Sequence, residues 1–197
     1  MSRYHYSLDK ELTYTINGND KTMNGTIAIN PLSDTNDNRR ITIKNINFVA
    51  KNGAGSCIIS PDRNVYNKYS SSHNVTVANC TFTDKDGAVN CAAIRHDDGG
   101  DKNWTIIGCT VDATMHSLIQ TNNVAGKLVI DDCDVFSKNG ANLNSCTNIE
   151  ITNSPFAVKG YAIRLGVNSG GNPEEAKSLV LSGNTLKSEC NDGDAVI

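Results

Sequence analysis

An eight-residue phrase recurs six times in this 197-residue chain and constrains the fold more than any other feature. The copies begin at Ile41, Val75, Trp104, Leu128, Ile149 and Leu179. Their first and third residues are always apolar, which is the period-two pattern of a strand that buries one face. Each copy therefore predicts a strand, and the recurrence predicts that these strands stack on one another.

The middle of the phrase predicts a sharp bend followed by a second strand. The fifth position reads Asn45, Asn79, Gly108, Asp132, Asn153 and Gly183. Gly, Asn and Asp are the residues that enter left-handed backbone at low cost. The eighth position is apolar again, with Phe48, Phe82, Val111, Val135, Phe156 and Leu186. The phrase is thus read as strand, bend and strand.

A shorter apolar phrase lies between the copies and supplies a third strand. It reads SCIIS from Ser56, AAIRH from Ala92, SLIQT from Ser117, ANLNS from Ala141 and YAIRL from Tyr161, and DAVI from Asp194 closes the chain. Stacked repeats of this kind form a solenoid with parallel pairing at about 4.8 Å between strands. Leucine-rich repeats are disfavoured, because the connections lack a helical pattern. A β-sandwich would not align one Gly/Asn/Asp column between two apolar columns.

These residues resemble the pectate-lyase-like right-handed parallel β-helix superfamily over residues 12–197. Asn45, Asn79 and Asn153 look like the asparagine ladder at its short turn, and Asp132 is close in kind. The resemblance implies an all-β, single-stranded right-handed parallel β-helix of about six to seven coils, with three short strands per coil. It also implies a secreted or cell-surface protein. Activity does not follow, because this superfamily includes lyases, hydrolases, epimerases, phage tailspikes and adhesins.

Residues 1–197 are expected to form one β-helix domain that was cut from a longer chain. Uncapped coils at its ends would favour end-to-end or side association. With a net charge of -3, the chain lacks the excess of basic residues that nucleic-acid binding requires. No apolar run is long enough for membrane insertion. Cys80, Cys109 and Cys133 share the sixth position of the phrase, so a buried ladder of free thiols is predicted.

The candidate binding surface is the outward face of the third strand. Aligning this strand on its last inward apolar residue predicts an outward column of Ser60, Arg95, Gln120, Asn144 and Arg164. In the enzymes that the chain resembles, the corresponding sheet is the floor of a substrate cleft. Tyr66 and Tyr69, in the loop after Pro61, could stack on sugar rings or simply cover the side of the solenoid.

The densest polar cluster runs from Arg95 to Asp101. Asp97, Asp98 and Asp101 lie around two glycines and could ligate Ca²⁺, although the spacing of a specific calcium loop is absent and a solvated acidic turn is the plainer interpretation. The candidate catalytic residues are Arg95, His96, Asp98 and His116, the last expected one coil beyond His96.

Two functions stay open at this point. The first is a carbohydrate-interacting module that acts on an acidic glycan in a lyase-like or glycosidase-like manner. The second is a non-catalytic structural or adhesive segment of a bacterial surface protein or phage fibre. The signature triplets of polygalacturonases do not occur in the sequence, which favours the second function. Long loops beside the polar column favour the first.

Overall fold

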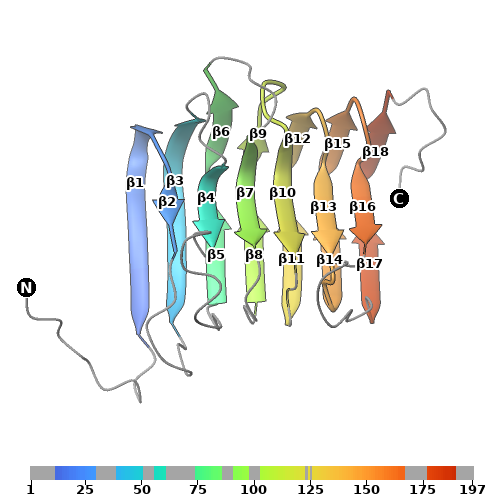
Figure 1. The fold of residues 1–197 in the computed structure, drawn as a ribbon, viewed down its shortest axis with the longest axis horizontal. Coiled ribbons are helices and arrows are strands. Elements are labelled where there is room, and N and C mark those ends of the chain that lie inside the picture. Colours follow the sequence, from blue (N-terminus) through green and yellow to red (C-terminus); the bar gives the residue numbers. More distant parts are fainter. Residues whose placement is uncertain are drawn as a thin grey trace, which may run out of the picture.

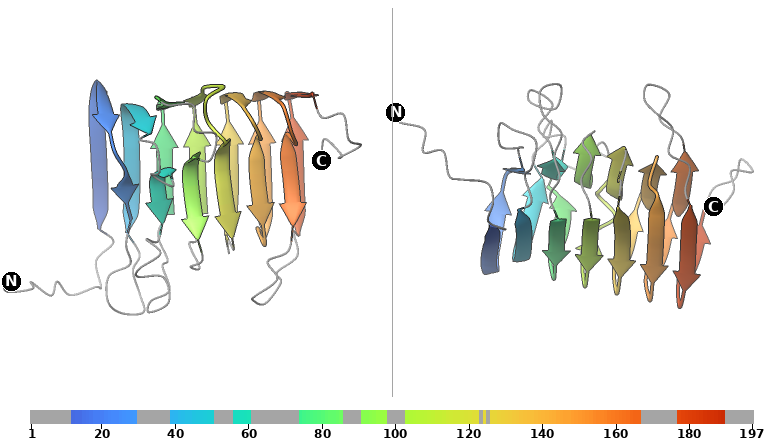
Figure 2. Two further views of the ribbon diagram at one scale, coloured as in Figure 1. Left: turned by 45° about the horizontal axis from the view of Figure 1, so that its top comes forward. Right: turned by 90° about the horizontal axis from the view of Figure 1, so that it is seen from below.

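The computed structural model describes residues 12–29, 39–50, 56–60, 74–85, 91–97, 103–122, 124, 126–166 and 177–189. Every regular element within them is a β-strand, and they contain no helix that could cross a membrane. All strand pairs are parallel, and they belong to a twelve-stranded and a six-stranded sheet. Figures 1 and 2 show the repeats stacked side by side from the blue N-terminal to the red C-terminal end. The prediction of an all-β parallel solenoid is confirmed.

Both halves of the phrase contribute to the twelve-stranded sheet. It contains β1 (Thr13–Asn24), β3 (Arg40–Ala50), β5 (Asn74–Ala78), β6 (Thr81–Asp84), β8 (Asn103–Ile107), β9 (Thr110–Val111), β11 (Lys127–Asp131), β12 (Asp134–Ser137), β14 (Asn148–Thr152), β15 (Pro155–Val158), β17 (Ser178–Ser182) and β18 (Thr185–Ser188). The six-stranded sheet faces the viewer in Figure 1. It contains β2 (Ile27–Ala28), β4 (Ser56–Ser60), β7 (Ala92–Asp97), β10 (Ser117–Asn122), β13 (Ala141–Asn144) and β16 (Ile163–Gly166).

The strand register confirms the alignment of the phrase. Its first residues pair in one row across β3, β5, β8, β11, β14 and β17, from Ile41 to Leu179. At the fifth position all six residues have a positive φ, between 50° and 69°. The phrase is therefore strand, left-handed bend and strand, as the residue types predicted.

Apolar columns fill the space between the sheets. The side chains of Ile43, Phe48, Phe82 and Trp104 are fully buried, and the rings of Phe48 and Phe82 stack at a centroid distance of 5.2 Å. Each repeat contributes residues to the same columns, so the core is continuous along the solenoid. Burial of apolar surface, at about 25 cal/mol per Å², is the main stabilising contribution of such a core.

The glycines of the bend column make room for asparagine side chains. A Cβ atom on Gly108 would lie 2.5 Å from Oδ1 of Asn79, and one on Gly183 would lie 2.6 Å from Oδ1 of Asn153. The amide of the preceding repeat therefore lies over each glycine. At Gly108 and Gly183, the asparagine amide of the preceding repeat occupies the space where a side chain on the glycine would lie.

The sixth position forms the predicted ladder of thiols. Cys80, Cys109 and Cys133 are buried and free. Their Sγ atoms lie 3.9, 3.7 and 3.6 Å from backbone carbonyl oxygens of the preceding repeat. Ser154 continues the column, and its hydroxyl accepts a hydrogen bond of 3.1 Å from the Cys133 N–H.

Candidate functional site

One row on the outward face of the six-stranded sheet is polar in four successive repeats. Arg95 of β7 pairs with Gln120 of β10, Gln120 with Asn142 of β13, and Asn142 with Arg164 of β16. Ile59 of β4 precedes Arg95 in the same row. We call Arg95, Gln120, Asn142 and Arg164 the polar column. The predicted stacking of Gln120 on Arg95 is confirmed.

The prediction was wrong for two residues, Ser60 and Asn144, which do not lie in the row of Arg95 and Gln120. Ser60 pairs with His96, and it is fully buried. Asn144 lies two residues beyond Asn142 and pairs with Asn122. In β4 and β13 two apolar residues compete as the alignment point, and Ile58 and Ala141 occupy it instead of Ile59 and Leu143. The column therefore contains Asn142, and Ile59 stands where Ser60 was expected.

His96 is not on the outward face, so it is no candidate for surface catalysis. Its side chain is fully buried, and its ring Nδ1 lies 3.1 Å from Oγ1 of Thr121. The indole of Trp104 meets the imidazole edge-on, with a centroid distance of 5.8 Å. Alternation along β7 places Arg95 outward and therefore turns its neighbour His96 inward. His96 is a core residue held by a hydroxyl and an aromatic ring.

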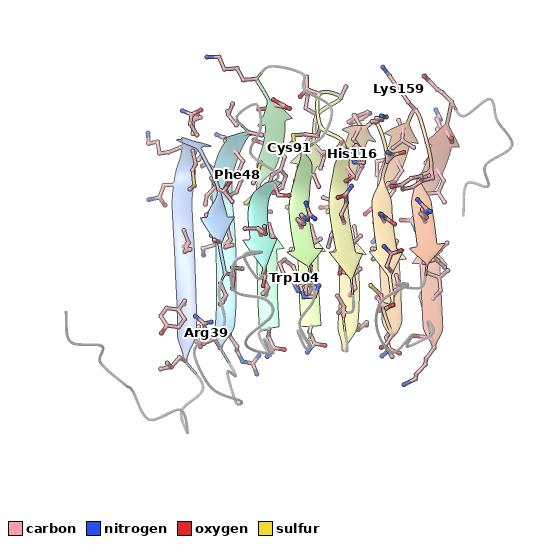
Figure 3. All side chains as sticks on the ribbon, viewed as in Figure 1. Arg39, Phe48, Cys91, Trp104, His116 and Lys159 are labelled. Carbon is pink, nitrogen blue, oxygen red and sulfur yellow. The ribbon has the colours of Figure 1, made fainter. Side chains whose placement is uncertain are left out.

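His116 lies beside the polar column, at the upper end of β10 in Figure 3. Its Nδ1 is 3.1 Å from the side-chain nitrogen of Gln120, and its Nε2 is 3.3 Å from that of Asn139. Partial burial, and to a smaller degree the nearby Lys138 ammonium, lower the pKa of His116. The imidazole is thus kept neutral over a wider pH range, and two amides hold it in place.

The far end of the polar column is an exposed arginine that lies over an aromatic ring. The guanidinium carbon of Arg164 is 5.8 Å from the centroid of Tyr161, a cation–π distance. Burial raises the pKa of the Tyr161 hydroxyl. Oδ1 of Asn142 is covered and has no hydrogen-bond partner among the described residues.

Asn139, Asn142 and Tyr161 were not among the predicted site residues. A signal for Asn142 was present, since two-residue alternation from Leu143 back to Ala141 puts it outward. Asn139 and Tyr161 lie at corners between strands, where alternation gives no direction.

The remaining predicted site residues cannot be placed. Tyr66, Tyr69, Asp98 and Asp101 lie outside the described residues, and for Asp97 only the strand position in β7 is described. Among the described residues there is no group of three or more His, Cys, Asp or Glu side chains that could hold a metal ion. The calcium loop therefore stays a prediction.

Comparisons with protein-family models, curated proteins and solved structures find no match to this chain.

Proposed function

We propose that this protein is a secreted or cell-surface module that binds an acidic glycan along the polar column. We further infer that its solenoid is a right-handed, pectate-lyase-like β-helix of about six to seven coils with three strands each. The support is the repeated phrase, the left-handed bend column and the parallel register of both sheets.

The observation that carries the binding proposal is the in-register row of two arginines and two amides. Arg95 and Arg164 are three strand spacings apart, about 14 Å along the solenoid. Gln120 and Asn142 fill the two intermediate repeats. Guanidinium groups hold carboxylates through paired N–H donors, and amides both donate to and accept from hydroxyls. A chain of uronate residues presents both groups at regular intervals.

Binding is better supported than cleavage. Glycoside hydrolysis requires a pair of carboxyl groups across the scissile bond, and the polar column contains none. His96, one of the four candidate catalytic residues, is inside the core. His116 has two amide neighbours and no described carboxylate partner to make it a stronger base.

The test is calorimetric titration with oligogalacturonate and with a neutral oligosaccharide of equal length. Arg95→Ala should weaken oligogalacturonate binding by about 1.5 to 3 kcal/mol, or roughly ten- to a hundredfold, the range of a hydrogen bond to a charged group. Gln120→Ala should weaken it less. Arg40→Ala is the matched control, because it removes an exposed arginine from the other sheet with the same change in net charge. Circular dichroism checks that each variant is folded.

A rigid spacer or adhesive segment is the second candidate function. The uninterrupted register from β3 to β17 favours it, because stacked parallel strands make a stiff rod. If neither glycan binds, or if Arg95→Ala binds as well as the parent, the glycan proposal is wrong and the spacer function stands. An ultraviolet assay for unsaturated product, applied to the same mixtures, would reveal lyase activity.

A further inference from the structure

A second concave surface lies on the other sheet. A groove of about 760 Å³ runs over the outer face of β12, β15 and β18, within the usual size range of small-molecule sites. Phe136, Ala157, Lys159, Lys187 and Glu189 are among its lining residues. The groove contains no residue of the polar column.

The strand register explains why the surface is hollow here. Phe136 pairs with Ala157, and Ala157 pairs with Lys187, so one small residue lies between two large ones on the outward face. Ala157 and Phe136 both line the groove. Lys159 follows β15 directly and lies beyond its upper end in Figure 3.

Phe136 is the exposed member of the four phenylalanines in the chain. Its side chain is 47% exposed, whereas Phe48, Phe82 and Phe156 are buried in the core. An aromatic ring that faces an open groove offers a flat apolar surface for stacking. The aliphatic C–H face of a pyranose ring fits such a surface.

The charges around the ring favour an anionic ligand. Lys159 and Lys187 line the groove with one carboxylate, Glu189, and no described residue forms an ion pair with either lysine. Among the described residues that line the groove, two ammonium groups against one carboxylate give a net positive charge. Glu189 can accept hydrogen bonds from hydroxyl groups.

We propose that this groove binds one ring of an acidic sugar. The C–H face of the ring packs on Phe136, its carboxylate lies between Lys159 and Lys187, and a hydroxyl donates to Glu189. This site is separate from the polar column, so it can exist whether or not the column binds a glycan.

The test is a titration with sodium glucuronate followed by NMR of backbone amides, with glucose as the neutral probe. Glucuronate should shift the amides of Ala157, Lys159 and Lys187, and glucose should bind more weakly. Phe136→Ala should weaken glucuronate binding roughly three- to tenfold, and Phe136→Tyr should restore it, because tyrosine keeps the ring face. Lys187→Ala should weaken glucuronate binding but leave that of glucose unchanged.

Val180→Ala and Arg95→Ala are the controls. Val180 is 48% exposed on β17, away from the groove, so its removal tests for a general effect of losing exposed apolar surface. Arg95→Ala should leave the shifts at Ala157 intact, which separates this site from the polar column. Three results would overturn the proposal: shifts confined to the polar column, equal affinity for glucose, or no change with Phe136→Ala.

Discussion

The bend at Gly108 gives the most direct test of how this solenoid is held together. Gly108 has a φ of 61°, and a Cβ atom there would lie 2.5 Å from Oδ1 of Asn79. In Gly108→Ala, left-handed backbone costs about 1 to 2 kcal/mol. Crowding against the amide adds about 1 to 3 kcal/mol. We expect a total loss of about 2 to 5 kcal/mol in the free energy of unfolding.

A double-mutant cycle separates the two contributions. Asn79→Gly removes the amide but keeps a residue that accepts the positive φ of that bend. In the Asn79→Gly background, Gly108→Ala should cost only the backbone contribution of about 1 to 2 kcal/mol. The remainder is the coupling between the two positions.

Denaturant unfolding measures these values through the fluorescence of Trp104. It is the single tryptophan of the chain, is fully buried, and lies in β8 just before the bend. Gly183→Ala repeats the experiment against Asn153. An equal cost of Gly108→Ala in both backgrounds would refute the amide contact. A cost below about 0.5 kcal/mol in the parent would refute the backbone argument as well.

Three further predictions concern the titration of His116 and the chemistry of the thiols. Because the pKa of His116 is lowered below its ordinary value of 6.5, the unfolded chain takes up this proton first, and His116 reduces stability as the pH falls below about 6.5. His116→Gln should therefore lose less stability than the parent between about pH 7 and 5 in parallel melts; equal slopes would contradict this. Alkylation of unfolded, unreduced protein should label Cys80, Cys109 and Cys133, and mass spectrometry that finds any of them paired would refute the free ladder. Burial raises the pKa of Cys146 to about 11, so its labelling in the native state should be much slower than after unfolding.

The fold could be predicted because the repeat aligns the chain with itself. Six copies of one phrase identify a bend position at which only Asn, Asp and Gly occur. The same comparison identified the buried column of Cys80, Cys109 and Cys133, since equivalent positions in stacked repeats must face the same way. The lateral contact between His96 and Trp104 could not be predicted, because it joins strands of two different sheets.

The candidate site was predicted only in part. In β13 the alignment was off by two residues, which kept Asn144 on the outward face but in the wrong row, and in β4 it was off by one. In a strand, a shift of one residue turns every side chain to the opposite face. The short strand β4 contains Ile58 and Ile59 in succession, and choosing the wrong one turned buried Ser60 outward. In β7, β10 and β16 the chosen alignment residues, Ile94, Ile119 and Ile163, do lie in one row. The sequence therefore placed Arg95, Gln120 and Arg164 correctly in the next row.

Three residues that were not predicted, Asn139, Lys159 and Tyr161, lie where the chain passes from one sheet to the other. Asn139 follows β12 and contacts His116. Lys159 follows β15 and lines the groove, and Tyr161 contacts Arg164 three residues later. The chain changes direction at this corner, so the alternation of neighbouring side chains no longer tells which side of the sheet each one faces. Residues of the β15–β16 corner also belong to both candidate surfaces, because Lys159 lines the groove and Tyr161 lies beside Arg164 of the polar column. Because Lys159 and Tyr161 are only two positions apart, a change in the length of this corner would displace the wall of the groove and the support of Arg164 together.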